Sequence, residues 1–247
     1  MSNKHTYRDL KVARYIKGRI PRHIGVIPDG NRRYAKKYGL TYLEAYQHGV
    51  EKAQDFAEWC RELGIKYLTY YSLSLENLKN RSSSELDILF KLMEQYLKKM
   101  LYDERIHREH VRIRVAGRLE KLPSNIQQLI KELEKATASY DRYHIILLIA
   151  YSGRLEIIDA VRKILTNISG SCNVNEEVFR RYLYIPEIPD PDLILRTSGE
   201  MRISNFLIWQ SAYSELIFIK KYWPEITKED LIRAIEEYQH RERRFGR

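Results

Sequence analysis

The sequence predicts an α/β fold built on a mostly parallel sheet, and three observations lead to this class. Short apolar runs alternate with longer stretches of helical periodicity along the 247 residues, which is the pattern of βαβ units. The runs are rich in β-branched and aliphatic residues and mostly lack polar alternation, as in strands covered on both faces. A hydrophobic fraction of 44% with scattered charges is typical of a globular chain rather than a disordered one.

Six apolar runs are the expected strands. In chain order they occupy residues 24–27, 65–71, 111–116, 145–151, 193–195 and 216–219. Because helical stretches separate most of them, we expect right-handed crossovers and parallel pairing. The sequence therefore predicts a six-stranded sheet flanked by helices.

The segments between these runs are the expected helices. Residues 41–63 and 85–101 carry apolar side chains at steps of three and four, the period of an amphipathic helix. A helical stretch follows Asn31, and further helices are expected over residues 123–140, 154–167, 176–183, 204–213 and 227–244. The apolar stripe of residues 85–101 is wider than a surface helix needs, which leaves two interpretations open: core packing or the wall of an apolar cavity.

Charge and cysteine content limit the class of protein. The formal net charge of +10 predicts an anionic partner, which is a nucleic acid, a phosphorylated small molecule or an anionic lipid surface. Cys60 lies in a helical pattern and Cys172 in a loop, so both are expected to be free thiols in a reducing compartment. No apolar run approaches the ~20 residues of a membrane span, and residues 1–20 lack the core of a signal peptide. We expect a cytoplasmic protein with one domain over residues 1–247, in which residues 1–20 form a basic, loosely ordered arm.

The stretch HIGVIPDGNRRYAKK (residues 23–37) places an acid, a glycine and four bases after an apolar run. Strand ends in open α/β sheets bind ligands, and helix N-termini attract anions. Gly30 lets the chain turn and lets phosphate approach the backbone closely. Arg32 and Arg33 can bind phosphate through paired hydrogen bonds. Asp29 suits this setting if Mg²⁺ joins its carboxylate to a phosphate. The alternative is an ordinary turn with solvated bases.

Two further loops at strand ends carry similar side chains. Residues 191–210 run from a strand into a predicted helix, with Ser204 expected as the helix N-cap. Two arginines around a Ser/Gly turn there suit a second diphosphate. The loop over residues 72–85 offers Ser74, Asn77 and Arg81, and Glu215 supplies a carboxylate just before the last strand. These three loops can bind anions, and a wide apolar helix is expected beside one of them. Together they predict a ligand with a charged head and an apolar tail.

Together, HIGVIPDGNRRYAKK, SLSLENLKNRSSSE and DLILRTSGEMRISNFLIWQSAYSEL resemble the cis-prenyltransferases, the family of undecaprenyl and dehydrodolichyl diphosphate synthases, from about residue 20 to residue 246. The resemblance implies a six-stranded parallel sheet flanked by helices, a hydrophobic tunnel and a homodimer. It also implies Mg²⁺-dependent addition of isopentenyl diphosphate units to an allylic diphosphate primer. The chain lacks the DDxxD run of trans-prenyltransferases, which agrees with the cis family.

The resemblance also implies roles for individual residues. Asp29 and Glu215 would hold Mg²⁺, and the reacting groups would be surrounded by Asp29, Asn31, Ser74 and Asn77, with Glu85 nearby. The primer diphosphate would contact Gly30, Asn31, Arg32, Arg33 and Arg81, with Asn77 and Leu78 at the closing loop. Isopentenyl diphosphate would contact Arg196, Arg202 and Ser204. At the C-terminus, Arg244 and Gly246 would form an R-x-G element that reaches the active site of the dimer partner.

Three positions depart from the bacterial pattern of the family. Tyr42 and Tyr46 stand where bacterial members usually carry arginine and histidine, and Leu78 stands where a bulky aromatic is usual. An extra residue lies near Asn80. These tyrosines and the GNRR run resemble archaeal members, which implies geranylgeranyl diphosphate rather than farnesyl diphosphate as the primer.

Two rival functions are weighed against this enzyme. A catalytically silent partner subunit of a two-component prenyltransferase would lack the DGN acid and the arginine pair, all of which are present. A nucleic-acid-binding protein is suggested only by the net charge, which is spread along the chain, so no nucleic-acid partner is expected. The expected product is a polyprenyl diphosphate, the precursor of a glycosyl carrier lipid, released through peripheral contact with the inner face of a membrane.

Overall fold

The structure, a computed structural model, describes residues 18–167 and 173–241. Cys172, Arg244, Gly246 and most of the predicted N-terminal arm lie outside the described residues. Each expected strand is present, with small shifts at its ends: β1 His23–Ile27, β2 Tyr67–Ser74, β3 Val111–Ala116, β4 Tyr143–Tyr151, β5 Leu193–Arg196 and β6 Glu215–Phe218.

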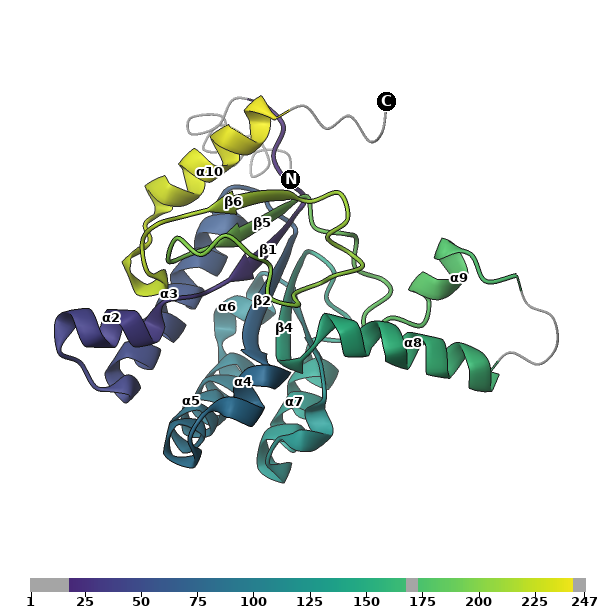
Figure 1. Ribbon diagram of the computed structural model, residues 1–247, viewed down its shortest axis with the longest axis horizontal. Coiled ribbons are helices and arrows are strands. Elements are labelled where there is room, and N and C mark those ends of the chain that lie inside the picture. The colour runs from purple at the N-terminus through teal and green to yellow at the C-terminus, as the bar shows by residue number, and fades with distance from the viewer. Residues whose placement is uncertain (1–17, 168–172, 242–247) are drawn as a thin grey trace.

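The strands form one sheet in the order β3-β4-β2-β1-β5-β6, and each of these neighbouring pairs is parallel. The prediction of a six-stranded parallel sheet is therefore confirmed. β1 lies in the interior of the sheet (Figure 1), between β2, which follows it in the chain, and β5, which comes much later. The strand order reverses at β1, and the crevice at such a reversal is where open α/β sheets bind ligands.

Helices flank this sheet. In the described residues they are α2 Asn31–Tyr38, α3 Tyr42–Glu62, α4 Leu75–Asn80, α5 Ser83–Tyr102, α6 Glu104–Arg108, α7 Ser124–Ala136, α8 Gly153–Asn167, α9 Glu176–Arg180 and α10 Lys228–His240. Capping residues in the sequence explain why several of these helices begin where they do. At α3, for example, Thr41 and Glu44 form a reciprocal capping box that satisfies two free N–H groups.

The helix predicted over residues 204–213 is wrong, because this segment forms turns. Ser204, Asn205 and Leu207 have φ angles of 48°, 65° and 42°, and left-handed residues cannot continue a right-handed helix. Phe206 is fully buried, and a Cβ on Gly25 would lie 2.9 Å from its ring. Packing of Phe206 against the sheet therefore overrides the helical periodicity of the segment.

The two faces of the sheet are covered differently. On one face, strand residues such as Ile24 and Leu68 pack with Phe56 of α3 and Leu231 of α10, and β3 and β4 pack against α5 and α7. The opposite face packs against the irregular segment that contains Phe206. α8 extends away from the sheet, with α9 beside it (Figure 1). No helix within the described ranges is long and apolar enough to cross a membrane.

Candidate active site

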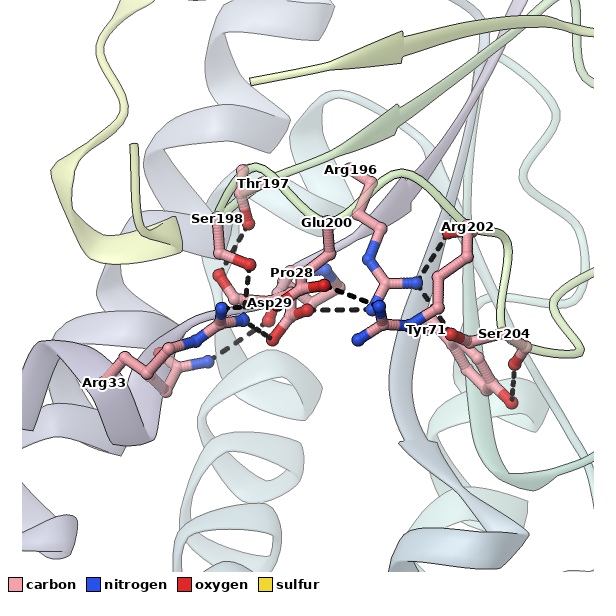
Figure 2. A network of polar contacts seen from close by, with 11 residues as sticks. Pro28, Asp29, Arg33, Tyr71, Arg196, Thr197, Ser198, Glu200, Arg202 and Ser204 are labelled. Carbon is pink, nitrogen blue, oxygen red and sulfur yellow. Dashed lines mark hydrogen bonds and ion pairs between the residues drawn. The ribbon is translucent and has the colours of Figure 1, made fainter. Parts of the chain in front are cut away.

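Asp29 and Arg196 meet where β1 and β5 end. The last residue of β1, Ile27, pairs with Arg196 in the register of the two strands, so the following Asp29 comes close to the Arg196 side chain. Arg196 Nη2 donates to Asp29 Oδ2 at 2.8 Å, and Arg33 Nη2 donates to Asp29 Oδ1 at 3.1 Å. Figure 2 shows the two arginines approaching the carboxylate from opposite sides. The structure thus joins two of the sequence-predicted loops.

The surroundings of Asp29 keep its carboxylate ionised. Partial burial raises the pKa of Asp29, but the hydrogen bonds and charges of Arg196 and Arg33 outweigh burial and lower this pKa below its ordinary value. The Asp29 backbone is held as well, because its carbonyl accepts a hydrogen bond from Thr197 Oγ1 at 2.7 Å. Asp29 is therefore a fixed, charged oxygen donor at the end of the sheet.

The loop after β5 is organised around Arg196. Arg196 Nη1 donates to Ser204 Oγ at 2.7 Å and to the Arg202 carbonyl at 2.6 Å. The prediction that Ser204 caps a helix is therefore wrong, since its hydroxyl instead accepts from the buried guanidinium of Arg196. The left-handed φ of Ser204 turns the chain so that the Arg202 and Ser204 side chains lie on the same side as Asp29 (Figure 2).

Glu200 also belongs to the site, although no sequence pattern predicted it. It accepts from Arg33 Nη1 at 2.7 Å through one oxygen and from Arg202 Nη1 at 2.5 Å through the other. Glu200 thereby links the predicted primer arginine to the predicted isopentenyl arginine. Its position inside the motif RTSGE was the one available signal.

The start of α2 presents backbone N–H groups to the same site. Gly30 has a φ of 105°, and a Cβ there would lie 2.8 Å from the Tyr222 ring, so only glycine fits. No side chain caps α2, which leaves its first N–H groups free to bind an anion. Asn31 Nδ2 donates to the Pro28 carbonyl at 3.2 Å, whereas its buried Oδ1 has no hydrogen-bond partner among residues 18–167 and 173–241.

A second charged cluster lies beside α2 and joins α3 to α5. The Tyr46 hydroxyl donates to the buried carboxylate of Glu85 at 2.5 Å and accepts from Arg81 Nη1 at 3.0 Å. Arg81 also pairs with Glu85 at 3.4 Å, and Arg32 lies 4.0 Å from the same carboxylate. Arg32 further contacts the ring face of Tyr42. The two tyrosines that depart from the bacterial pattern thus hold the predicted primer arginines.

The third predicted loop is placed only in part at the site. Ser74 ends β2, and its hydroxyl accepts from the Asn77 backbone N–H at 3.0 Å, which starts α4. Both residues line the cavity described below. Leu78 is not among the residues that line the cavity and packs, partly buried, against the apolar cluster of α5 and α7. The structure therefore does not bring Leu78 together with the other predicted substrate residues, and its contact with substrate stays a prediction.

A cavity of about 1430 Å³ begins at this charged group and continues between the sheet, α3 and α5. Its mouth includes Asp29, Arg33, Arg81 and Arg202. Its walls are mainly apolar and include Val50, Ala53, Ala57, Leu89, Leu92, Met93, Tyr96, Leu97, Met100, Ile106, Ile145, Leu147 and Ile149. Part of the stripe predicted over residues 85–101 therefore faces a cavity, as one of its two interpretations required.

Glu215 lies at the other end of the sheet from Asp29. It begins β6 and pairs with Leu193, whereas Arg196, the neighbour of Asp29, pairs with the last residue of β6. Three residues of strand separate the two ends by about 10 Å, while Mg²⁺ binds oxygens at about 2.1 Å. Glu215 instead accepts from Arg241 Nη1 at 3.1 Å. Within one chain, Asp29 and Glu215 are not brought together.

The donor set at Asp29 fits a metal that is held partly by substrate. Within the described residues no group of three or more His, Cys, Asp or Glu side chains could hold a metal ion. Mg²⁺ nevertheless needs only one or two carboxylates, because it completes its coordination with phosphate oxygens and water. Asp29 could supply one such ligand.

Comparison with known proteins gives consistent matches. The sequence model of the undecaprenyl diphosphate synthase family matches residues 27–246. A tritrans,polycis-undecaprenyl-diphosphate synthase (geranylgeranyl-diphosphate specific) of Methanopyrus kandleri is 50% identical over 98% of this chain and 90% of its own length. An isoprenyl transferase of Thermotoga maritima is 50% identical, with 92% and 97% covered. The crystal structure of lavandulyl diphosphate synthase from Lavandula x intermedia, in complex with dimethylallyl diphosphate, matches with a TM-score of 0.86 and 33% identity, covering 92% of this chain and 99% of that chain.

Proposed function

Because this chain belongs to the undecaprenyl diphosphate synthase family of cis-prenyltransferases, it is a prenyltransferase that makes a polyprenyl diphosphate, and we propose that it adds isopentenyl diphosphate units to geranylgeranyl diphosphate. The observation that carries this proposal is the charged group of Asp29, Arg33 and Arg196 at the mouth of an apolar cavity. Such a site suits a ligand with a diphosphate head and a hydrocarbon tail.

The two diphosphates bind on the two sides of Asp29. The primer diphosphate lies against the N-terminus of α2, where Gly30 permits a close approach and Arg32 and Arg33 supply positive charge. The isopentenyl diphosphate lies against Arg202 and Ser204, which Arg196 holds in place. Asp29 would supply a carboxylate ligand to Mg²⁺, whose charge would neutralise part of the diphosphate charge.

The reaction then follows from the positions of these groups. The bond between the primer's first carbon and its diphosphate oxygen breaks, and the isopentenyl double bond supplies the electron pair of the new carbon–carbon bond. The old primer diphosphate departs with the electrons of the broken bond and accepts the proton that the isopentenyl unit loses. Arg33 and the α2 N–H groups stabilise the charge that develops on this leaving group. The lengthened tail extends along the apolar cavity.

The choice of primer is supported by two observations. The relative from Methanopyrus kandleri is named as specific for geranylgeranyl diphosphate. In this chain Tyr42 and Tyr46 hold Arg32 and Arg81, so the primer end of the site differs from the bacterial pattern. Because the product tail is insoluble in water, its release involves peripheral contact with a membrane.

The proposed function is tested by incubating the protein with labelled isopentenyl diphosphate, Mg²⁺ and geranyl, farnesyl or geranylgeranyl diphosphate, followed by sizing of the products. We expect polyprenyl products, with the highest kcat/KM for geranylgeranyl diphosphate. No incorporation with any primer by the folded protein would refute the reaction. Equal kcat/KM values for the three primers would refute only the choice of primer.

We also propose that the enzyme acts as a homodimer in which Arg244 and Gly246 complete the partner's site. The position of Glu215 supports this arrangement, because Glu215 can join a metal site only if it comes from a second chain. Mixed dimers of an Asp29→Ala subunit and an Arg244→Ala subunit test it. One of their two sites regains both residues, so activity should return towards half of wild type. Activity that stays at the level of the single variants, in dimers verified by differential tagging, excludes a tail that acts in the partner's site.

A further inference from the structure

Asn205 joins loops that follow three different strands. It comes directly after Ser204 in the loop after β5, and its Nδ2 donates to Glu76 Oε1 at 2.8 Å and to Ser152 Oγ at 2.7 Å. Glu76 belongs to α4, which follows β2, and Ser152 directly follows β4. Asn205 Oδ1 accepts from the Arg154 backbone N–H at 2.9 Å. The side-chain amide therefore uses both of its N–H donors and its oxygen on the other two loops.

The backbone around Asn205 permits these contacts. Its φ of 65° lies in the left-handed region, which asparagine tolerates better than most residues. The Asn205 carbonyl accepts from the Gly153 backbone N–H at 2.9 Å. A Cβ on Gly153 would lie 2.8 Å from that carbonyl oxygen, so glycine at the start of α8 allows the two loops to come this close.

Pairing of the strands does not by itself hold these loops together. In the described sheet β1 lies between β5 and β2, and β4 lies beyond β2, so the β5 loop shares no ladder of hydrogen bonds with the other two. The Tyr71 hydroxyl of β2 adds one contact, to the Ser204 carbonyl, at the longer distance of 3.3 Å. The short hydrogen bonds across the position of β1 come from the Asn205 side chain.

The joined loops carry residues that we assign to different parts of the reaction. Arg202 and Ser204 on the β5 loop contact isopentenyl diphosphate in the proposed function. Asn77, the neighbour of Glu76 in α4, belongs to the predicted reacting groups. Asn205 and Glu76 line the same cavity as these residues. The Asn205 bridge therefore spans the gap between the isopentenyl side of the site and α4.

We propose that Asn205 is a positioning residue that fixes the isopentenyl side of the site relative to α4 and so aligns the two reacting carbons. The inference rests on the proposed function of the same site. Arg196 separately holds the Arg202 carbonyl and the Ser204 hydroxyl, so without the bridge isopentenyl diphosphate still binds but is misplaced relative to the primer. A displacement of about 1 Å can slow a reaction about 10²-fold. The effect is therefore on kcat rather than on KM.

The test is Asn205→Asp, which keeps the shape of the side chain but replaces the donor amide by a carboxylate that faces Glu76. An ionised carboxylate only accepts hydrogen bonds, so the bridge to Glu76 is broken. The rescue variant adds Glu76→Gln, whose amide can donate to the new carboxylate and restores the bond with donor and acceptor exchanged.

Asn125→Asp is the matched control. Asn125 Nδ2 donates to Glu94 Oε2 at 2.8 Å between α7 and α5, so this variant also places a carboxylate against a glutamate. Neither Asn125 nor Glu94 lines the cavity, and the control therefore leaves the site intact.

For each variant kcat, both KM values and Tm are measured with labelled isopentenyl diphosphate, geranylgeranyl diphosphate and Mg²⁺. We expect Asn205→Asp to lower kcat about tenfold or more, with both KM values within about threefold of wild type. Addition of Glu76→Gln should restore most of this kcat, and Asn125→Asp should match the wild type. An unchanged kcat, a rise in KM alone or no recovery in the double variant overturns the inference, because a merely structural role lowers Tm and is not rescued by exchange of donor and acceptor.

If Asn205→Asp does not fold, Glu76→Ala removes the exposed acceptor of the same bridge and is measured in the same way. It should lower kcat with both KM values nearly constant, and an unchanged kcat overturns the inference. A folded wild-type protein that incorporates no isopentenyl diphosphate with any primer overturns the proposed function itself, which is a different result from an active wild type with an unaffected variant.

Discussion

Replacing Tyr46 by phenylalanine removes one hydroxyl from the contact between α3 and α5, and we expect it to lower both stability and affinity for the primer. The hydroxyl donates to Glu85 at 2.5 Å and accepts from Arg81 at 3.0 Å. Tyr46 and Glu85 are only 7% and 5% exposed, so water cannot freely replace the lost hydrogen bond. Burial raises the pKa of Tyr46, which keeps the hydroxyl protonated in any assay near neutral pH.

The loss of stability depends on the ion pairs that Glu85 keeps in the variant. A hydrogen bond to a charged group contributes about 1.5–3 kcal/mol, and Glu85 keeps Arg81 at 3.4 Å and Arg32 at 4.0 Å. We therefore expect the low end, a loss of about 1.5–2 kcal/mol in the free energy of unfolding. In a domain of this size each kcal/mol lowers Tm by about 2–4 °C, so Tm should fall by roughly 3–8 °C.

The assay combines thermal unfolding with Michaelis constants for both substrates. Without the hydroxyl, Arg81 turns towards Glu85, so the KM for the primer should rise severalfold while the KM for isopentenyl diphosphate stays constant. Tyr102→Phe is the control, because Tyr102 is 78% exposed and the loss of its hydroxyl should cost less than about 0.5 kcal/mol. A Tyr46→Phe variant with wild-type Tm, or with both KM values raised equally, would refute the reasoning.

Four further outcomes are expected. Asp29→Asn should lower elongation by about 10²-fold or more, because an amide lacks the negative charge that holds a metal ion; activity within a few-fold of wild type contradicts the metal assignment. Arg202→Ala should raise the KM for isopentenyl diphosphate about ten- to a hundredfold, the value of ~1.5–3 kcal/mol, and leave the primer KM unaltered; an equal rise in both argues against separate sites. Met93→Trp should shorten the products by blocking the cavity, whereas a lower Tm with unchanged product length indicates overpacking of a core position. Burial lowers the pKa of His23 from 6.5 to about 4, so between these pH values the unfolded chain binds a proton that the folded chain excludes. The free energy of unfolding should therefore fall by about 3 kcal/mol as the pH drops from 6.5 to 4. Urea unfolding of His23→Gln should lack this pH dependence, and an equal pH dependence in both proteins refutes its assignment to His23.

Properties that depend on neighbours in the sequence were predicted correctly. The strands follow from short β-branched and aliphatic runs, and most helices follow from apolar residues at steps of three and four, because both patterns reflect which faces of an element are buried. Gly30 was correctly expected at a turn, since only glycine easily adopts its φ of 105°. The loops that we propose to bind the diphosphates were recognised by residue type and by their position after strands.

The partners of these residues could not be predicted from the sequence alone. Arg196 reaches Asp29 across 167 residues of chain, and Glu200 joins two arginines that the sequence assigned to different substrates. Such contacts depend on how strands align in the sheet. The same alignment places Glu215 at the opposite end from Asp29, although both residues flank strands and carry the same charge.

Local propensity and periodicity, which depend on residues close along the chain, specify the class of fold, the order of its elements and the chemistry of the loops. Contacts between distant segments determine that residues 204–213 form turns, that Asp29 and Glu215 lie at opposite ends of the sheet and that the cavity reaches Arg61. In each case the deciding energy comes from packing, or from pairing of charges, between segments far apart in the chain. Burying Phe206 against the sheet, for example, outweighs the helical preference of its neighbours.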